Sequence, residues 1–375
     1  MSRKSVVGLD IGSTGIRAVE VKGRPGSLRL AKAASIDLPR GAWVDGEIVD
    51  DKAVVTALKK LWKKGRFSTR RVVYGLSDPH ILTRQMDLPW MAEEDFREAL
   101  RFQVGDALPV DAATVEMDYH LLGEIQGTDE RGVGARMNRI LLVAADREGI
   151  RREASILRKA GLEPVGADSP SFALIRAACQ GIVPSDGKAH ALVDIGAEQL
   201  TLVVYQDGQP LFIRTVTNVG GAIATTAIAE ALHVDPEEAE ALKVATGLNG
   251  PAPVVAPVAE SAIFSSGDDT APLDPRAAET MAALAPWAAT IVGEIRNSLE
   301  YFHASSPGVE ISDLSLTGRT VALAGVRERI ATEVPVPVRT LDPFLGLPHA
   351  RRLTKEPVPD TRLAVAGGLA MGGAA

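Results

Sequence analysis

The sequence is poor in residues that build several common kinds of site. Its 375 residues include one cysteine, Cys179, and six widely spaced histidines, and aromatic residues make up only 4%. A single cysteine excludes internal disulfide bonds and thiolate metal clusters, and the histidines lack the regular spacing of zinc ligands. Cys179 is most simply a small buried hydrophobic residue.

Long hydrophobic runs and an excess of positive charge are also missing. The longest uncharged run, Val244–Ala259, contains three prolines, and a transmembrane helix needs about 20 apolar residues. Forty-one basic and 48 acidic residues give a net charge of −7, which argues against nucleic acid as a partner. Met1–Lys4 leads straight into an apolar strand pattern without a secretory segment, so we expect a cytoplasmic protein.

The remaining composition, 46% hydrophobic and 24% charged, is that of a globular protein with two or more lobes. Alternating and β-branched patterns predict strands at Val6–Asp10, Ile16–Val21, Ser27–Asp37 and Arg71–Leu76. Helical spacing predicts a helix over Asp51–Lys64. These segments form the first unit.

A second unit follows. It begins with a strand at Ile81–Leu88 and a helix in which Phe96, Leu100 and Val104 form an apolar stripe. Two strands, Val115–Leu122 and Asn138–Ala144, follow, and a loop at Gly123–Met137 joins them. A helix at Arg147–Ala160 ends the unit. The stripe is typical of core packing, although it could also line a peptide groove.

From Glu163 the first pattern returns. Ser169-Pro170 is typical of a helix start, and a strand–turn–strand pattern follows at Ala189–Tyr205. Helices are predicted at Ala222–Leu232, at Pro236–Thr246 and at Ala277–Ala304, and the third of these is expected to be kinked near Pro286. A strand is predicted at Ile311–Leu316, followed by a helix that ends at about Glu333. Gly250–Pro275 has no periodicity and is expected to be a mobile loop, and Leu363–Gly373 a helix or coil of small residues.

An offset of 184 residues superposes two motifs. Val6–Gly12 matches His190–Gly196, and each is an apolar strand followed by Asp, an apolar residue and Gly. Glycine turns between strands direct backbone N–H groups into a concavity that holds phosphate oxygens, and a strand-end aspartate can hold Mg²⁺ opposite them. Two such turns facing each other would clamp a polyphosphate, whereas the alternative interpretation is a pair of ordinary hairpins.

At these residues the sequence resembles the actin-like ATPase superfamily (actin, Hsp70, hexokinase, FtsA), and within it the PilM family of type IV pilus assembly proteins. The likeness extends through Val72–Pro109, Ala160–Pro164, Val193–Gly196, Glu237–Lys243 and Glu294–Phe302. It implies an α/β fold of the duplicated actin-like (ribonuclease H-like) type, with two lobes around a nucleotide cleft. Subdomain 1A would comprise 1–77, 163–188 and the tail 346–375. An inserted SHS2-like 1C would be 78–162, and 2A and 2B would be 189–345.

The resemblance also implies ATP and Mg²⁺ as ligands. The nucleotide-binding residues carried over from it are Asp10, Gly12, Ser13, Thr14, Gly15, Asp194, Gly196, Ala197, Gly221, Glu240, Lys243, Gly318 and Arg319, with Asp10 and Asp194 toward the metal. No catalytic residue is assigned. The alternative to a binding role is purely structural: the two aspartates would be ordinary turn residues, and Glu240 and Lys243 would form a surface ion pair.

Partners follow from the same resemblance. Such proteins bind the N-terminal cytoplasmic segment of PilN, an inner-membrane protein, between 1A and 1C, so we expect a cytoplasmic scaffold of a type IV pilus or related type II secretion complex. It would reach the membrane through partners, contact pilus motor ATPases, and form a homo-oligomer or ring.

The sequence departs from the family pattern in two loops. Glu198 and Gln199 stand where small hydroxyl residues are usual, and Arg319 replaces a glycine of the adenosine loop. A carboxylate facing a triphosphate is repulsive, and Arg319 either stacks on adenine or fills the pocket. We therefore expect at most a weak ATPase.

Two other functions compete with the scaffold. A sugar kinase of the same superfamily would need a general base beside a substrate pocket, and an FtsA-like filament would end in a basic amphipathic helix, unlike the uncharged tail.

Asp168 could orient a water, but is more simply an acid at a helix N-terminus. Lys59–Arg71 holds seven basic residues that could meet anionic lipid or an acidic partner, or form a solvated helix end.

Overall fold

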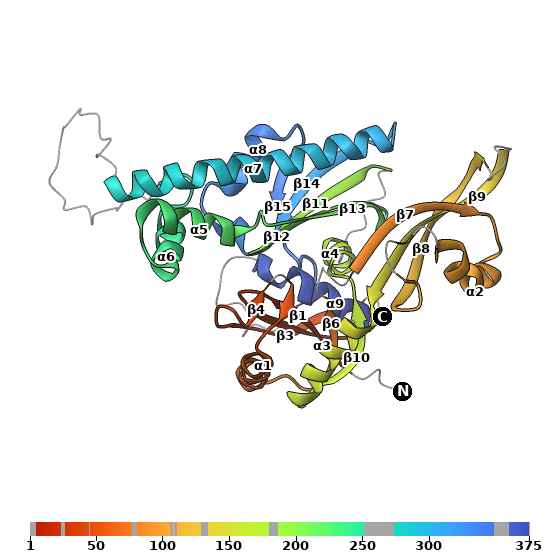
Figure 1. The fold of residues 1–375 in the computed structure, drawn as a ribbon, viewed down its shortest axis with the longest axis horizontal. Coiled ribbons are helices and arrows are strands. Elements are labelled where there is room, and N and C mark those ends of the chain that lie inside the picture. The colour runs from red at the N-terminus through yellow and green to blue at the C-terminus, as the bar shows by residue number, and fades with distance from the viewer. Residues whose placement is uncertain are drawn as a thin grey trace.

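The computed structural model describes residues 5–23, 27–44, 46–76, 81–105, 108, 111–128, 134–179, 187–250, 274–348 and 360–374. Its main features are two five-stranded sheets, a smaller three-stranded sheet, and helices that cover them (Figure 1). The predicted loop at Gly250–Pro275 lies almost entirely outside the described residues.

The first sheet has the strand order β10-β6-β1-β2-β3. Strands β1 (Val6–Gly12), β2 (Gly15–Lys22) and β3 (Arg29–Asp37) form an antiparallel meander, and β6 (Arg71–Gly75) and β10 (Glu163–Asp168) join in parallel. Both faces of the central strands β1 and β2 are largely buried, so these strands read as nearly continuous apolar runs.

The second sheet repeats that arrangement, with the order β13-β12-β11-β14-β15. Strands β11 (Ala189–Ile195), β12 (Gln199–Gln206) and β13 (Gln209–Thr217) form the meander, and β14 (Ile311–Thr317) and β15 (Val338–Thr340) add in parallel. The duplicated fold predicted from the two motifs is confirmed.

Helices pack on both sheets through their apolar faces. α1 (Asp51–Gly65) and α3 (Arg147–Lys159) cover one face of the first sheet, and α5 (Gly221–Leu232), α6 (Pro236–Thr246), α7 (Pro275–Ser305) and α8 (Val326–Glu333) surround the second. α1 begins where the Asp50 side chain accepts hydrogen bonds from the first turn. α7 is continuous through Pro286, whose missing hydrogen bond falls on an exposed side of the helix.

Two further helices, α4 (Pro170–Ala178) and α9 (Ala364–Ala374), lie between the two large sheets (Figure 1). The predicted small-residue tail is thus a helix, and its composition explains its position. A Cβ atom on Gly368 would lie 1.8 Å from the carbonyl oxygen of Ala173 in α4, and one on Gly8 would lie 2.0 Å from that of Ala366. Cys179 packs at the edge of this core and is only partly buried, so the prediction of a buried cysteine is half right.

The third sheet has the order β7-β9-β8, with β7 (Ile81–Pro89), β8 (Val115–Thr128) and β9 (Gly134–Asp146) antiparallel. Helix α2 (Glu93–Val104) buries the apolar stripe of Phe96, Leu100 and Val104 against this sheet. The stripe therefore belongs to a hydrophobic core, as the first of the two interpretations predicted. The predicted loop at Gly123–Met137 is wrong, because both strands continue past a register shift between Leu121 and Gly123. The irregularity, with positive φ at Gly123, hid the alternation.

Several short elements had no sequence signal: β4 (Trp43–Val44), β5 (Glu47–Ile48), and the 3₁₀ turns η3 (Thr320–Ala322) and η5 (Thr361–Leu363). Among the described helices, none is long and apolar enough to cross a membrane.

Candidate functional site

The two repeated strand–turn–strand units face each other across a small cavity of about 130 Å³. Asp10 on β1 and Asp194 on β11 both line it, and they occupy equivalent ladder positions, opposite Arg17 and Thr201. The duplication therefore brings two carboxylates from distant parts of the chain to one place, as the motif predicts.

Arg17 is the cation that the structure places between these acids. Its guanidinium lies 3.4 Å from the Asp10 carboxylate, and its side chain is largely buried. Arg17 lies five residues after Gly12, within the second strand of the first motif, and nothing in the motif pattern singles it out.

Burial raises the pKa of both carboxyl groups. For Asp10 the raising effect of burial is partly offset by Arg17. For Asp194 burial and then the charge of Asp10 raise the pKa to about 7, again against the effect of Arg17. One guanidinium thus does not balance two desolvated carboxylates, and a divalent cation bound beside them would relieve the repulsion. Oxygen ligands of this kind suit Mg²⁺.

The glycines of the site serve different purposes. Gly318 has φ +96°, and a Cβ there would lie 2.5 Å from the Asp194 Oδ1 atom, so the position accepts only glycine. Gly12 and Gly196 line the small cavity. Gly15 lines neither of the two cavities of the site, and a Cβ on it would lie 2.6 Å from the carbonyl oxygen of Ile36, so it permits strand packing.

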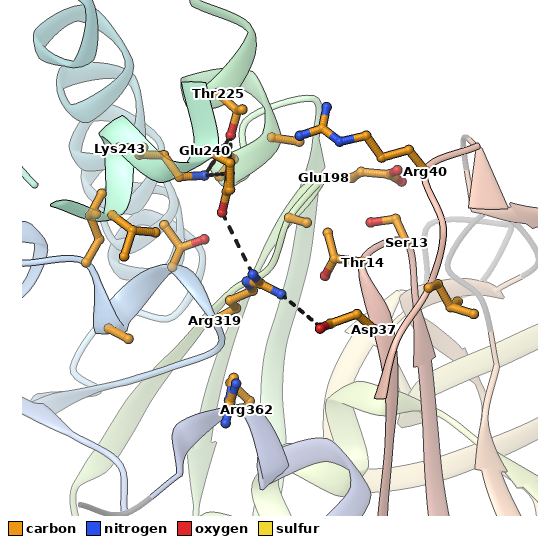
Figure 2. Close-up of a pocket in the computed structure, with 18 of the residues that line it drawn as sticks. Ser13, Thr14, Asp37, Arg40, Glu198, Thr225, Glu240, Lys243, Arg319 and Arg362 are labelled. Carbon is orange, nitrogen blue, oxygen red and sulfur yellow. Dashed lines mark hydrogen bonds and ion pairs between the residues drawn. The ribbon is translucent and has the colours of Figure 1, made fainter. Parts of the chain in front are cut away.

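A larger cavity of about 780 Å³ adjoins the small one. Ser13, Thr14, Ala197, Glu198 and Arg319 line both, so the two cavities form one continuous site. This volume lies within the range of small-ligand pockets. Its far end is built from α5 and α6, as Figure 2 shows.

Lys243 and Glu240 of α6 form a buried network at that end. The Lys243 ammonium donates to the Gly221 carbonyl oxygen at 2.8 Å, to Thr225 Oγ1 at 2.7 Å and to Glu240 Oε2 at 2.6 Å. Burial lowers the pKa of Lys243 despite Glu240, and the hydrogen bonds from Lys243 and Thr225 hold the pKa of Glu240 below its usual value against the effect of burial. All three ammonium protons are thereby used within the protein, and Lys243 fixes Glu240 at the cavity wall.

Arg319 crosses the mouth of the cavity. Its guanidinium lies 3.7 Å from Asp37 at the end of β3 and 3.9 Å from Glu240 on α6, so it links the two lobes (Figure 2). Arg40 makes a second link by donating to the Pro236 carbonyl oxygen at 2.8 Å. Arg319 thus reaches across the cavity between the two carboxylates and leaves the cavity open.

Asp168 takes no part in the site. Its carboxylate accepts a hydrogen bond from the Ser169 N–H at 2.7 Å and pairs with Arg176. It lines neither cavity, which agrees with the simpler interpretation as an acid at the start of α4.

Sequence reasoning missed several lining residues. Thr225 lies within α5, Thr320 begins η3, Asp37 ends β3 and Arg362 lies in η5, whereas Arg40 and Asp360 come from loops beside the site. Loop residues carry no periodicity, and they reach the cavity only through the fold. No group of three or more metal-ligating side chains occurs among the described residues.

Two sheets of equal topology, whose first turns share one site, define a protein of the actin-like ATPase fold. A family model for the type IV pilus assembly protein PilM matches residues 8–262 and 276–374. The chain belongs to the PilM family.

Solved structures agree with this fold. A PilM–PilN type IV pilus biogenesis complex matches with a TM-score of 0.81 and 24% identity, covering 100% of this chain and 99% of the other. The ethanolamine utilization protein EutJ of Carboxydothermus hydrogenoformans matches at 0.55 and 15%, covering 99% and 90%. MreB5 of Spiroplasma citri bound to ADP matches at 0.50 and 13%, covering 98% and 95%.

Proposed function

We propose that this protein is an ATP-binding scaffold of a type IV pilus assembly complex that binds the N-terminal segment of a PilN-like inner-membrane protein. Membership of the PilM family supports the pilus role. The observation that carries nucleotide binding is the continuous cavity between two facing strand turns. The proposal includes the division into 1A (1–77, 163–188 and 346–375), 1C (78–162) and 2A with 2B (189–345).

The cavity offers a place for each part of a nucleotide. The turns at Ser13, Thr14 and Ala197 lie where the two cavities meet, so they would hold the phosphates. Gly221, Glu240 and Gly318–Arg319 would bound the nucleoside. Mg²⁺, held by Asp10 and Asp194, would neutralise phosphate charge. The neighbouring structure of MreB5 is an ADP complex, which supports a nucleotide at this site.

The same geometry favours binding over turnover. Asp168 is held by Arg176 and Ser169 outside the cavity, so it does not position a water. Glu198 adds a carboxylate to the phosphate end. The nucleotide would therefore act as a ligand that holds the lobes in one arrangement, with at most weak hydrolysis.

A pocket of about 360 Å³ between the short β4–β5 hairpin and the start of α3 suits the partner segment. Residues 46–48 form one side, and Asp146, Glu148, Gly149, Arg152 and Glu153 the other. Arg152 donates to the Ile48 carbonyl oxygen at 2.7 Å and joins the two sides. Its acidic side chains would attract the amino group and basic side chains of an N-terminal peptide.

Calorimetric titration with ATP, with Mg²⁺ and with EDTA, tests the nucleotide site. We expect Mg²⁺-dependent binding that Asp10→Asn, which keeps the side chain's shape, weakens at least about tenfold, because it removes one of the two acids facing the metal. Asp87→Asn on β7 is the matched control and should bind like the wild type. A folded wild-type protein without affinity for ATP, or equal loss in both variants, would contradict the proposal.

A further inference from the structure

Helices α1 and α3 bring a large number of basic residues to one place. Residues 51–71 contain eight basic side chains and one acidic side chain, and residues 147–160 contain five basic and two acidic, in a chain of net charge −7. The two helices pack against each other on the same side of the first sheet (Figure 1). We call this surface the α1–α3 face.

The lysines of α1 point outward along one side of the helix. Lys52, Lys59 and Lys63 lie at i, i+7 and i+11, and Lys60 lies beside them, and all four are exposed. The opposite side of α1 is buried in the first core. The positive charge therefore follows from the amphipathic pattern of the helix and is held on a rigid support.

Helix α3 extends the same charge. Arg151, Arg152, Arg158 and Lys159 are exposed. Only Asp51 offsets them on α1, at 2.9 Å from Lys159 and 4.0 Å from Arg152. Within the described residues no carboxylate is paired with the four exposed α1 lysines. The face thus retains a large uncompensated charge.

We propose that the α1–α3 face docks on an anionic lipid bilayer. Lysine ammonium groups on flexible stems are suited to a diffuse layer of lipid phosphates, and clusters of four to eight basic residues bind such surfaces. The α1 lysines line none of the three cavities described above, so their charge lies outside those pockets. The aromatic residues nearby, Trp62 and Phe67, pack on each other at 5.0 Å and present no stacking platform for bases.

The face continues into the pocket proposed for the partner segment, because Arg152 belongs to both. Bilayer contact would therefore place that pocket near the membrane surface. The inference goes beyond the proposed function and does not rest on it, since lipid binding needs neither nucleotide nor partner.

Vesicle co-sedimentation of the full chain tests the inference. Vesicles of phosphatidylcholine containing phosphatidylglycerol should pellet the wild-type protein, and phosphatidylcholine alone should not. Each lysine near such a surface strengthens binding about fivefold, so the triple variant Lys59→Gln, Lys60→Gln, Lys63→Gln should bind about a hundredfold more weakly. Raising the salt concentration should release the wild type.

A matched variant separates this face from overall charge. Arg296→Gln, Arg327→Gln and Arg329→Gln change three exposed basic residues of α7 and α8 and alter the net charge equally, and this variant should bind like the wild type. Thermal unfolding shows that both variants fold. Failure of the wild type to bind the anionic vesicles, binding to neutral vesicles alike, or equal loss in both variants would overturn the proposal, whatever the outcome for ATP or peptide.

Discussion

The carboxylates of Glu20, Asp10 and Asp194 are stabilised to very different degrees. Glu20 on β2 is fully buried, yet it accepts hydrogen bonds from the Ser68 N–H at 3.0 Å, from the Ser68 hydroxyl, and from Ser5 at 2.9 Å, and Lys22 lies 3.3 Å away. Asp10 and Asp194 are half-buried in the wall of the small cavity, and Arg17, 3.4 Å from Asp10, is the basic side chain that lowers the pKa of both against the effect of burial. The protein thus satisfies a structural acid and leaves the acids of the site undercompensated, ready for a cation.

Glu20 makes stability depend on pH. Burial opposes its charge, but the hydrogen bonds from Ser68 and Ser5 outweigh burial and hold its pKa below the ordinary 4.5. A lowered folded-state pKa stabilises the protein above the unfolded value, and this contribution is lost as the pH falls below 4.5 through the folded value. Glu20→Gln should cost about 1–3 kcal/mol at neutral pH.

Urea unfolding at pH 7 and at about pH 3 measures this effect. The difference in unfolding free energy between wild type and Glu20→Gln should shrink at the acidic pH. Glu300→Gln on the exposed side of α7 is the control and should change little. A difference that stays constant with pH would contradict the role assigned to Glu20.

Among the site residues, the sequence predicted those that belong to the repeated motif and missed those that occur in only one half of the chain. Asp10, Asp194 and the turns around them are visible because the same short pattern occurs twice. Arg17 and Thr201 occupy equivalent positions but differ in type, so comparison of the halves gave no signal for Arg17. The sequence alone could not show whether the Arg319 side chain stacks on an adenine or fills the pocket. The two carboxylates beside it, Asp37 and Glu240, come from separate lobes and meet it only in the folded protein.

Among the elements, α9 combines a sequence with little pattern and close packing on its neighbours. It is rich in glycine and alanine, and it contacts α4, β1, β2 and β6. Small residues let helix and sheet backbones approach closely, so the absence of large side chains is the structural requirement.

Gly368→Ala tests this packing. The added methyl group would lie 1.8 Å from the Ala173 carbonyl oxygen, and overpacking of this kind costs about 1–3 kcal/mol, occasionally more. Gly293→Ala on α7 is the matched control, because its Cβ would meet nothing within 4 Å, and it should stabilise by about 0.5–1 kcal/mol. Chemical denaturation of the two variants gives the comparison, and equal effects would contradict the close approach.

Periodicity predicted the long helices and the two meanders, because their apolar residues recur at regular intervals. It failed at the β8–β9 hairpin, where a shifted register interrupts the alternation, and at β4 and β5, which are too short to show a period.

The whole molecule is held together through its middle. Separate cores lie on each large sheet, and α4 and α9 join them in a third. Across the opening of the cavity, Arg319 and Arg40 make polar links between the lobes. Exposed ion pairs of this length contribute about 0–1 kcal/mol, so the central helices set the lobe arrangement.

The partner pocket depends on two parts of the molecule meeting. A peptide from the N-terminus of the PilN-like partner should bind the wild type, and the double variant Glu47→Lys, Glu148→Lys should bind at least about tenfold more weakly, because it reverses the pocket's charge. Calorimetry with that peptide is the measurement. Glu279→Lys, Glu300→Lys on α7 is the control, and a wild type that binds no peptide would refute the assignment.

The position of α9 also bears on synthesis. Residues 364–374 complete the packing around β1 and β2, which are made first, whereas the second sheet is complete by residue 340. During synthesis on the ribosome, the core around β1 and β2 can therefore be completed only after almost the entire chain has been made, because long-range contacts form only once both partners exist. Truncations that remove residues 364–374 leave the oldest part of the polypeptide without its partner.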